Sequence, residues 1–271
     1  MIQKSVAIAL SHSYLTDTLR TAASQAVAET GDYTNLSLTT PTRLNNIVEH
    51  IAIPFRVSRA QQIAQHYHGM NERERQTSKA LKDFGNALEF DLVRSTLVSG
   101  VSGTTPKMSG IIEAISKSTN YTTHTSTTAL VASILDGLMR LNWNNSNGDV
   151  ATDLFMGSFL RNVIDQFAQK SNVVVNTGGI SSIVKTVSTY ETAFGTVRFH
   201  KHRYVQQSGD AHGRILAIRP EKLALAWFEK PYIDMTLARS GPYDARAVAG
   251  SLTLEVRNQD SNWFAAGFVN A

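Results

Sequence analysis

The feature that most restricts the fold is the stretch from Asn71 to Ser99, which has the pattern of one long helix. It contains no proline and is rich in Gln, Arg, Lys, Glu, Ala and Leu. Its apolar residues recur at steps of three and four, as on the buried face of a helix; they are Ala80, Leu81, Phe84, Ala87, Leu88 and Leu92. Asn71 with Glu74 resembles a capping box, and Gly100 and Gly103 provide a stop. We therefore predict a spine helix of about eight turns, about 40 Å long at 1.5 Å per residue.

A polar stretch over residues 15–46 has the opposite character. It is rich in Thr, Ser, Ala and Asn, with Gly31-Asp32 as a turn signal and Pro41 as a breaker. Two extended arms around that turn would form a long hairpin with little apolar surface to bury. Because such a hairpin is marginally stable alone in water, we expect it to become ordered against a neighbouring copy of the chain. This is the first indication of self-assembly.

The rest of the chain has helical patterns followed by extended ones. A second helix is predicted over 128–141, with Ser126 or Thr127 as its cap, and a short buried strand over 151–156. Ser158 is predicted to cap a third helix that runs to Gln169. Beyond Val173, apolar and polar residues alternate as in half-buried strands, at 183–187, 197–199, 215–217 and 252–256. Helices followed by strands predict the α+β class.

Composition places the chain among folded proteins and excludes several chemistries. Of its 271 residues, 42% are apolar and 18% are charged, which is too apolar for intrinsic disorder. There is no cysteine, so disulfides, thiolate metal sites and cysteine nucleophiles are excluded. The formal net charge of +4 tolerates nearby nucleic acid without giving a concentrated basic face. No apolar run approaches the roughly 20 residues that span a bilayer, so no membrane partner is predicted.

Two His-x-His pairs have a spacing that suits metal binding. On a strand, His66 with His68 and His200 with His202 would each present both imidazoles on one face. No acidic third ligand has the right local spacing beside the first pair. Solvated or interface histidines are the favoured interpretation, and neither a metal nor another cofactor is predicted.

Ser182 and Lys185 match the Ser-x-x-Lys pattern of some acyl-transfer enzymes. That pattern requires a helix and companion motifs, whereas this stretch alternates like a strand. Gly178-Gly179 lacks the lysine and the context of a phosphate loop, so a turn is the favoured interpretation. A hydrolase that uses Ser182 and Lys185, or a histidine metal site, is a rival function from another class.

Charged residues on the predicted spine alternate in sign, as on a solvated or intersubunit face with i,i+4 pairs. The basic candidates for an inner surface, or for contact with the hairpin of a neighbouring copy, are Arg59, Arg73, Arg75, Lys79 and Lys82. On the hairpin itself, the candidates for intersubunit contact are Asp32 and Arg43. A solvated face explains the basic residues of the spine equally well.

Five short motifs occur in the same order as in one family of shell proteins. They are TPTRLNN at 40–46, VSRAQQ at 57–62, PKMSGI at 106–111, YETAFGTV at 190–197 and LEVRN at 254–258. Together they resemble the tailed-phage major capsid proteins with the HK97 fold, in the SU10-like branch. The fourth is similar to the Tyr-x-x-x-Phe-Gly-x-Val signature of that family. The resemblance runs from about residue 12 to the C-terminus, and a shorter segment before the hairpin makes a trimmed N-terminal arm one expectation.

The resemblance implies a non-enzymatic subunit that forms hexamers and pentamers of an icosahedral shell around double-stranded DNA. It implies an N-terminal arm at 1–17, an extended hairpin at 18–56, a peripheral domain with the spine helix and a two-stranded ribbon at 57–122 and 230–256, and an axial domain at 123–229 and 257–271. Implied partners are a portal, decoration or scaffold proteins, and packaged DNA in non-specific contact. The subunit would be made in the bacterial cytoplasm and end in the virion. An encapsulin-type shell, which packages protein, is the second rival.

Overall fold

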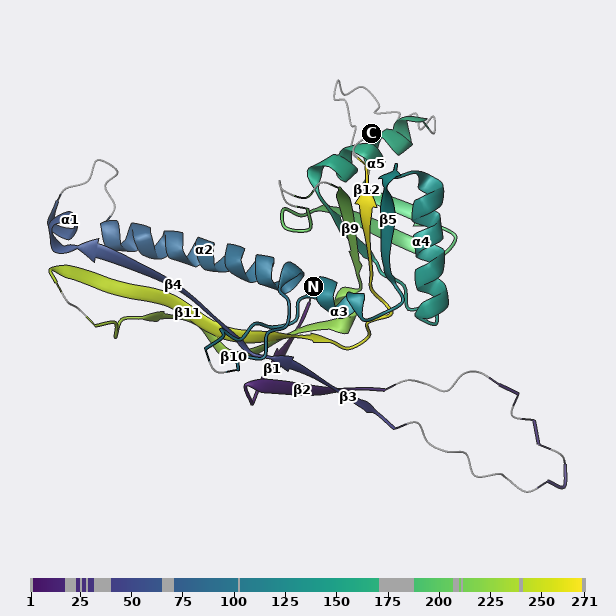
Figure 1. Cartoon of the computed structure of the whole chain (residues 1–271), viewed down its shortest axis with the longest axis horizontal. Helices are drawn as coiled ribbons and strands as arrows, with labels where there is room; N and C mark the ends of the chain where they lie inside the picture. Colours follow the sequence, from purple (N-terminus) through teal and green to yellow (C-terminus); the bar gives the residue numbers. More distant parts are fainter. Residues whose placement is uncertain are drawn as a thin grey trace, which may run out of the picture.

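The computed structural model has three parts (Figure 1): a long sheet that carries a long helix, a second sheet with its own helices at one end, and a separate two-stranded hairpin. The structure describes residues 2–17, 23–24, 26–27, 29–31, 40–64, 71–101, 103–170, 188–206, 210, 212–238 and 241–269. For residues 126–127 and 167–170 it describes the backbone alone. The combination of separate helices and sheets confirms the predicted α+β class.

Four strands form the sheet beneath the long helix, in the order β1-β10-β11-β4. They are β1 (Gln3–Val6), β10 (Leu223–Asp234), β11 (Tyr243–Val256) and β4 (Glu49–Ser58). β1 is parallel to β10, and the other neighbours are antiparallel. The predicted two-stranded ribbon near 230–256 is therefore part of a wider sheet. Residues 49–56, which the sequence places in the hairpin, pair with β11 and belong to this sheet instead.

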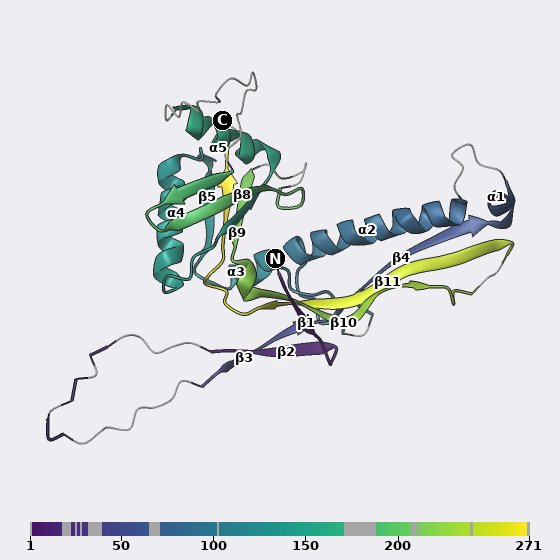
Figure 2. The ribbon, with the colours of Figure 1, turned by 180° about the vertical axis from the view of Figure 1, so that it is seen from behind.

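The helix α2 (Glu72–Arg94) lies along one face of this sheet in both views of the ribbon (Figures 1 and 2). Asn71 caps it by accepting a hydrogen bond from the N–H of Arg73 at 3.0 Å, in place of the predicted capping box with Glu74. Phe84 is buried against the sheet. At Gly250 on β11 a Cβ would lie 3.1 Å from the Phe84 ring, so the helix approaches closely because this strand position has no side chain.

The spine helix ends at Arg94 and not near Ser99 as predicted. Ser95 leaves the helix in an extended conformation. Val98 then pairs with Lys107 in an antiparallel bridge, with each N–H 3.1 Å from the other carbonyl oxygen. This bridge uses the backbone groups that would continue the helix, and it shortens α2 to about 35 Å.

The second sheet has six strands in the order β5-β12-β9-β6-β8-β7. They are β5 (Tyr121–Thr128), β12 (Trp263–Phe268), β9 (Gly213–Ile218), β6 (Asp153–Met156), β8 (Gly195–Lys201) and β7 (Thr189–Thr192). The helices α4 (Ala132–Asn145) and α5 (Ser158–Lys170) share a core with it. The helix predicted from Thr128 begins instead at Ala132, because the threonine-rich residues before it form β5 and pair with β12.

The hairpin consists of β2 (Ser11–Thr16) and β3 (Thr42–Ile47), which are antiparallel. Seen from behind (Figure 2), these two strands lie below β1 and β10. Most of its turn lies outside the described residues. The motif at 57–62 forms the separate short helix α1 (Arg59–Ile63) with its own capping box, and is not the start of α2. The remaining connections are α3 (Ile111–Ser116) and the short 3-10 helix η1 (Pro220–Lys222).

Candidate assembly surfaces

The hairpin joins the body at a point that we call the hairpin root, residues 46–49 together with 107–109. The side-chain amide nitrogen of Asn46 donates to the carbonyl oxygens of Ser109 at 3.1 Å and Leu254 at 2.8 Å. Its amide oxygen accepts from the N–H groups of Ser109 at 2.8 Å and Ile47 at 2.9 Å. Because Asn46 is buried, a lost bond would leave a polar group without a partner. Asn46 thereby ties β3 to the loop after α2 and to β11.

A second attachment joins β2 to the end of β11. His12 Nε2 lies 2.8 Å from Glu255 Oε1. Burial alone would raise the pKa of Glu255, but hydrogen bonds from Ser5, His12 and Arg257 outweigh it, so the pKa is lowered. The hairpin therefore has a carboxylate anchor as well as an amide anchor.

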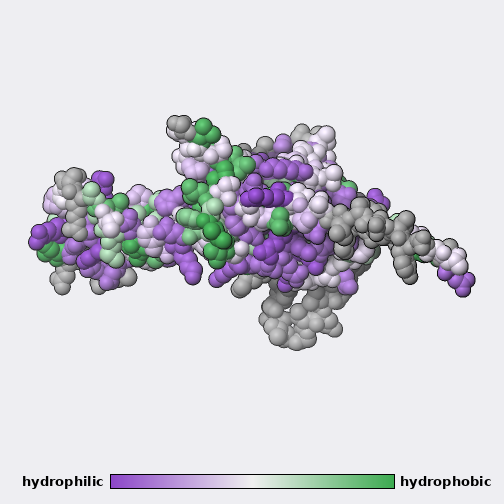
Figure 3. Space-filling view, turned by 90° about the horizontal axis from the view of Figure 1, so that it is seen from below, coloured by the Kyte–Doolittle hydropathy of each residue, from purple (hydrophilic) through white to green (hydrophobic). Residues whose placement is uncertain are grey.

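Apolar side chains are exposed along β1, β2 and the turn between them. Val6, Ile8 and Leu10 have exposed fractions of 71%, 90% and 69%, while Ala7 between them is buried. Leu15 on β2 is also exposed. Seen from below (Figure 3), the middle of the molecule carries a group of hydrophobic residues. A row of exposed apolar side chains is typical of a surface that a partner covers.

The far end of the first sheet carries a polar hollow of about 390 Å³, which we call the distal hollow. It is lined by Arg59, Gln62, Arg73, Gly241, Pro242, Tyr243 and Asp244. Asp244 Oδ2 lies 3.7 Å from Arg73 Nη1 and accepts a hydrogen bond from Arg246 Nε at 3.2 Å. The guanidinium of Arg56 lies over the Tyr243 ring, 5.1 Å from its centroid. Arginines outnumber the acidic side chain that lines the hollow, which suits a carboxylate from another molecule.

The predicted contact residues of the spine lie at and beyond this hollow. Arg59 on α1 and Arg73 on α2 both line it. Arg75 Nε donates to Glu72 Oε2 at 2.8 Å within α2. Lys79 is exposed farther along the helix.

Of the predicted contact residues of the hairpin, the described one, Arg43, does not line the distal hollow. Arg43 on β3 donates to Ser13 Oγ on β2 at 2.8 Å, across the two strands. Asp32 lies outside the described residues. The role of both in contacts between subunits stays a prediction.

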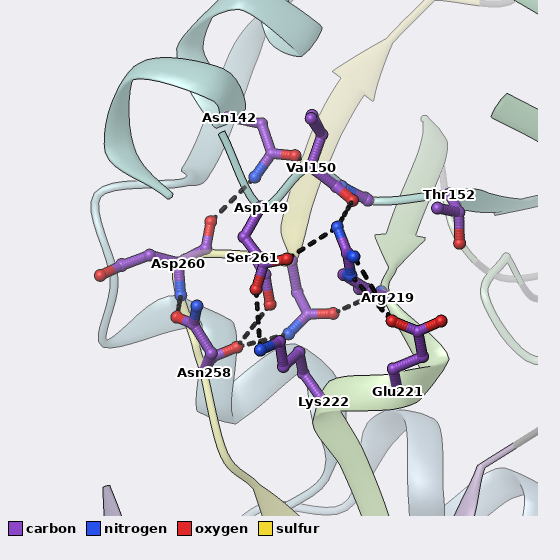
Figure 4. A network of polar contacts seen from close by, with 12 residues as sticks. Asn142, Asp149, Val150, Thr152, Arg219, Glu221, Lys222, Asn258, Asp260 and Ser261 are labelled. Carbon is purple, nitrogen blue, oxygen red and sulfur yellow. Dashed lines mark hydrogen bonds and ion pairs between the residues drawn. The ribbon is translucent and has the colours of Figure 1, made fainter. Parts of the chain in front are cut away.

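The two sheets are held together by a polar network where the chain crosses between them (Figure 4). Arg219 Nη1 lies 2.7 Å from Asp149 Oδ1, and Lys222 Nζ lies 3.1 Å from Asp149 Oδ2. The side chain of Asn142 on α4 donates to the carbonyl oxygen of Asp260 at 2.8 Å. The chain passes between the two sheets before β10 and again after β11. At both places it is bonded to α4 or to the connection between α4 and β6. These bonds fasten the two sheets to each other at both crossings.

The C-terminal end of the spine helix is bonded to the second sheet. Asp210 accepts two hydrogen bonds from Arg94, at 3.1 and 3.2 Å, and pairs with Arg214 at 3.1 Å. Two-pronged arginine–carboxylate contacts fix orientation as well as distance. They add to the rigidity of the junction.

The second His-x-His pair does share one face, as predicted, because the rings of His200 and His202 both contact Phe155, with centroids 5.0 and 5.8 Å away. His200 Nε2 lies 2.7 Å from Asp153 Oδ1, and His202 Nδ1 accepts from the N–H of Tyr204 at 3.2 Å. One nitrogen of each ring is therefore engaged within the protein. The described residues contain no group of three or more His, Cys, Asp or Glu arranged for a metal ion.

Several candidates from the sequence lie outside the described residues. They are His66, His68, Gly178-Gly179, Ser182 and Lys185. Among the helices that the structure describes, none has the length and apolarity to cross a membrane.

A family model described as the SU10 major capsid protein matches residues 1–267. The chain belongs to the SU10 major capsid protein family. This capsid protein is accordingly a structural subunit of a phage capsid, and its place is in the shell of the virion. No curated protein matches the chain.

Solved capsid structures share the fold of the capsid protein, and they confirm the predicted HK97-like architecture. A structure from Mycobacterium phage Bobi is 10% identical with a TM-score of 0.64, covering 100% of this chain and 89% of that one. The capsid of a native GTA particle is 12% identical with a TM-score of 0.65, covering 99% and 88%. An encapsulin complex from Synechococcus elongatus is 9% identical with a TM-score of 0.61, covering 100% and 86%.

Sequence reasoning about the capsid protein missed the residues of the hairpin root. Asn46 belongs to a recognised motif, but its role as a buried anchor was not foreseen. One signal was available: Leu44, Asn46 and Val48 share one phase of the strand pattern, and Asn46 is the polar residue in that inward phase. No residue near Asp244 in the sequence indicates that it lies in the distal hollow. It reaches the hollow because β11 pairs with β4.

Proposed function

We propose that this capsid protein forms hexamers and pentamers of a closed shell around double-stranded DNA, with each hairpin lying over a neighbouring copy. The observation that carries the proposal is the hairpin itself. Among the described strands, β2 and β3 pair with each other and with no other strand. Asn46 and His12 fasten the hairpin to its own body, and because a two-stranded ribbon is marginal alone, we expect a neighbour to supply further packing surface. Contacts between unlike surfaces that repeat by rotation close into rings.

Within this proposal, the sheet that carries α2 is the peripheral domain and the six-stranded sheet is the axial domain. β4 and all of β10 pair in the first sheet, which supports a peripheral domain that begins at Glu49 and includes Leu223–Asp234. The network around Asp149 and Arg219 supports an axial domain held at one angle to it. The axial domain packs around the five-fold and six-fold axes.

The distal hollow is proposed to receive a carboxylate from the hairpin of a neighbour, with Asp32 as the first candidate. Reversing the charge with Arg59→Glu and Arg73→Glu together should prevent shell formation. The matched pair Arg59→Lys and Arg73→Lys keeps the charge and should still assemble. Adding Asp32→Arg to the reversed pair should restore part of the assembly. Normal shells from the reversed pair would refute the contact.

The contact with DNA is proposed to be electrostatic and independent of sequence, hence weak for each subunit and weakened further by salt. Portal, scaffold or decoration proteins are proposed as further partners. The subunit is proposed to be made in the cytoplasm of the bacterial host and to act without catalysis. Loss of a hydrolase activity on Ser182→Ala, with assembly intact, would favour the enzymatic rival.

Electron microscopy of the purified full-length chain tests the proposal directly. Shells, tubes or rings of subunits are expected. Particles that protect a protein cargo and no DNA in the producing cells would favour an encapsulin-type compartment, which the fold also allows. A monodisperse monomer at every concentration and salt would contradict both.

A further inference from the structure

A buried carboxyl group lies in the hairpin root, where three elements meet. Glu49 is the first residue of β4, immediately after the bend at Val48 that ends the hairpin, and it is buried. Its Oε2 accepts a hydrogen bond from the N–H of Met108 at 3.2 Å. Met108 precedes Ser109, which Asn46 holds from β3. Glu49 and Asn46 together therefore fasten the hairpin to the loop that follows the spine helix.

Charged groups from two other elements act on Glu49. Asp91 comes from α2, and Lys107 comes from the loop. Burial, reinforced by the charge of Asp91 and opposed by the Met108 N–H and by Lys107, raises the pKa of Glu49 to about 7. Burial also raises the pKa of Asp91, against the effect of Lys107. With both carboxyls ionised, the buried Glu49 carries a negative charge near that of the half-buried Asp91, and the nearby positive charge is on the exposed Lys107.

Two histidine side chains also lie near the hairpin root and must be separated from Glu49 by experiment. His12 on β2 is bonded to Glu255 at 2.8 Å, and His50 on β4 has its Nδ1 2.9 Å from Ser251 Oγ on β11. A change of the root with pH must therefore be assigned by substitution to Glu49 or to one of these rings.

We propose that Glu49 and Asp91 form a proton-controlled latch that sets how firmly the hairpin is held to the body. While Glu49 is neutral, its carboxyl group accepts the Met108 bond without adding a charge beside Asp91, and the root is closed. When the proton leaves, the negative charge on the buried Glu49 is repelled by that of the half-buried Asp91, which favours opening between β4 and residues 108–109. The inference rests on the proposed function in one respect: the held hairpin is the arm that covers a neighbour.

The closed and the open root differ in how tightly they bind the proton of Glu49, and this difference decides how stability changes with pH. The closed root binds the proton of Glu49 more tightly than the open root, in which the ordinary pKa of 4.5 applies. Proton binding therefore favours the closed root, and this stabilisation is fully present below pH 4.5 and is lost as the pH rises through about 7. Between pH 6 and pH 8 the open fraction should rise roughly tenfold.

Amide hydrogen exchange of the full-length protein, read in the peptide that contains Met108 and Ser109, tests the latch. After correction for the intrinsic pH dependence of exchange, the wild-type rate should rise roughly tenfold from pH 6 to pH 8. Glu49→Gln keeps an acceptor for Met108 without a titrating group, so its corrected rate should not change with pH. Asp91→Asn should move the wild-type midpoint to lower pH.

Matched variants separate the latch from other causes. Glu229→Gln, at an exposed glutamate of β10, should keep the wild-type pH dependence, as should His12→Gln and His50→Gln. A dependence that persists in Glu49→Gln, or that vanishes in a histidine variant alone, overturns the proposal. Electron microscopy at pH 6 distinguishes failure of the latch from failure of the proposed shell. If particles form but the exchange rate at the root does not depend on pH, the latch alone is refuted. If no particles form, the proposed shell is refuted.

Discussion

At the scale of single residues, the sharpest constraint is a glycine in the second sheet. Gly267 on β12 has φ +94°, and a Cβ there would collide with the carbonyl oxygen of His124 on β5. Gly267→Ala should therefore destabilise the unassembled protein by at least 2 kcal/mol, as an order of magnitude, measured as a lower urea midpoint. Gly85→Ala is the matched control, because Gly85 lies in α2 with open space around it, and it should stabilise by about 0.5–1 kcal/mol. Equal midpoints for the two variants would contradict this account.

Asn46 gives the second prediction at this scale. Asn46→Ala removes a buried side chain that bonds Ser109 and Leu254, and it leaves their backbone groups without partners. The free energy of unfolding should fall by about 2–4 kcal/mol. Asn45 is exposed on the same strand, so Asn45→Ala should change stability by less than about 0.5 kcal/mol. Urea unfolding of both variants side by side checks the difference, and similar losses would show that Asn46 is not the anchor.

At the scale of elements, the sequence was sufficient where the signal is local. The start of α2 follows from Asn71 and the periodic apolar face. Its end does not, because the Val98–Lys107 bridge depends on a residue that lies beyond the helix. The predicted hairpin includes most of β4 for the same reason. Local signals do not show that β4 pairs with β11, which lies about 190 residues later in the sequence. The sequence predicts a helix cap at Ser126 or Thr127, because nothing local shows that β5 pairs with β12 near the C-terminus.

The contact between α2 and its sheet supports a prediction for an element. Phe84 is 4% exposed and packs in the core of the first sheet, whereas Leu81 on the same helix is 47% exposed. Phe84→Ala should cost about 3–5 kcal/mol of stability through the cavity it leaves. Leu81→Ala should cost less than about 1 kcal/mol. Thermal unfolding followed by circular dichroism distinguishes them, and a comparable loss in both would place the helix differently on the sheet.

At the scale of the whole molecule, the five short motifs in their order indicate the family more specifically than any single motif does. They led to the family and the architecture, both of which are confirmed over nearly the whole chain. The composition of the assembly surfaces was not accessible in the same way. Arg59, Arg73 and Asp244 form the distal hollow because a strand pairing brings distant segments together. The sequence indicates Arg59 and Arg73 as contact residues, but it does not indicate that Asp244 lies beside them.

The last prediction concerns what the hairpin contributes to the assembled particle. Replacing residues 20–40 with a two-residue Asn-Gly turn leaves β2, β3 and the bonds of Asn46 and His12 in place, and removes the part that is proposed to reach a neighbour. Helical content by circular dichroism should stay close to that of the full chain, because α2, α4 and α5 lie elsewhere. Shell formation should be lost, since the shortened arm can no longer bury surface on the next copy. Intact particles from this variant, seen by electron microscopy, would mean that the two sheets and their helices close the shell without the removed residues.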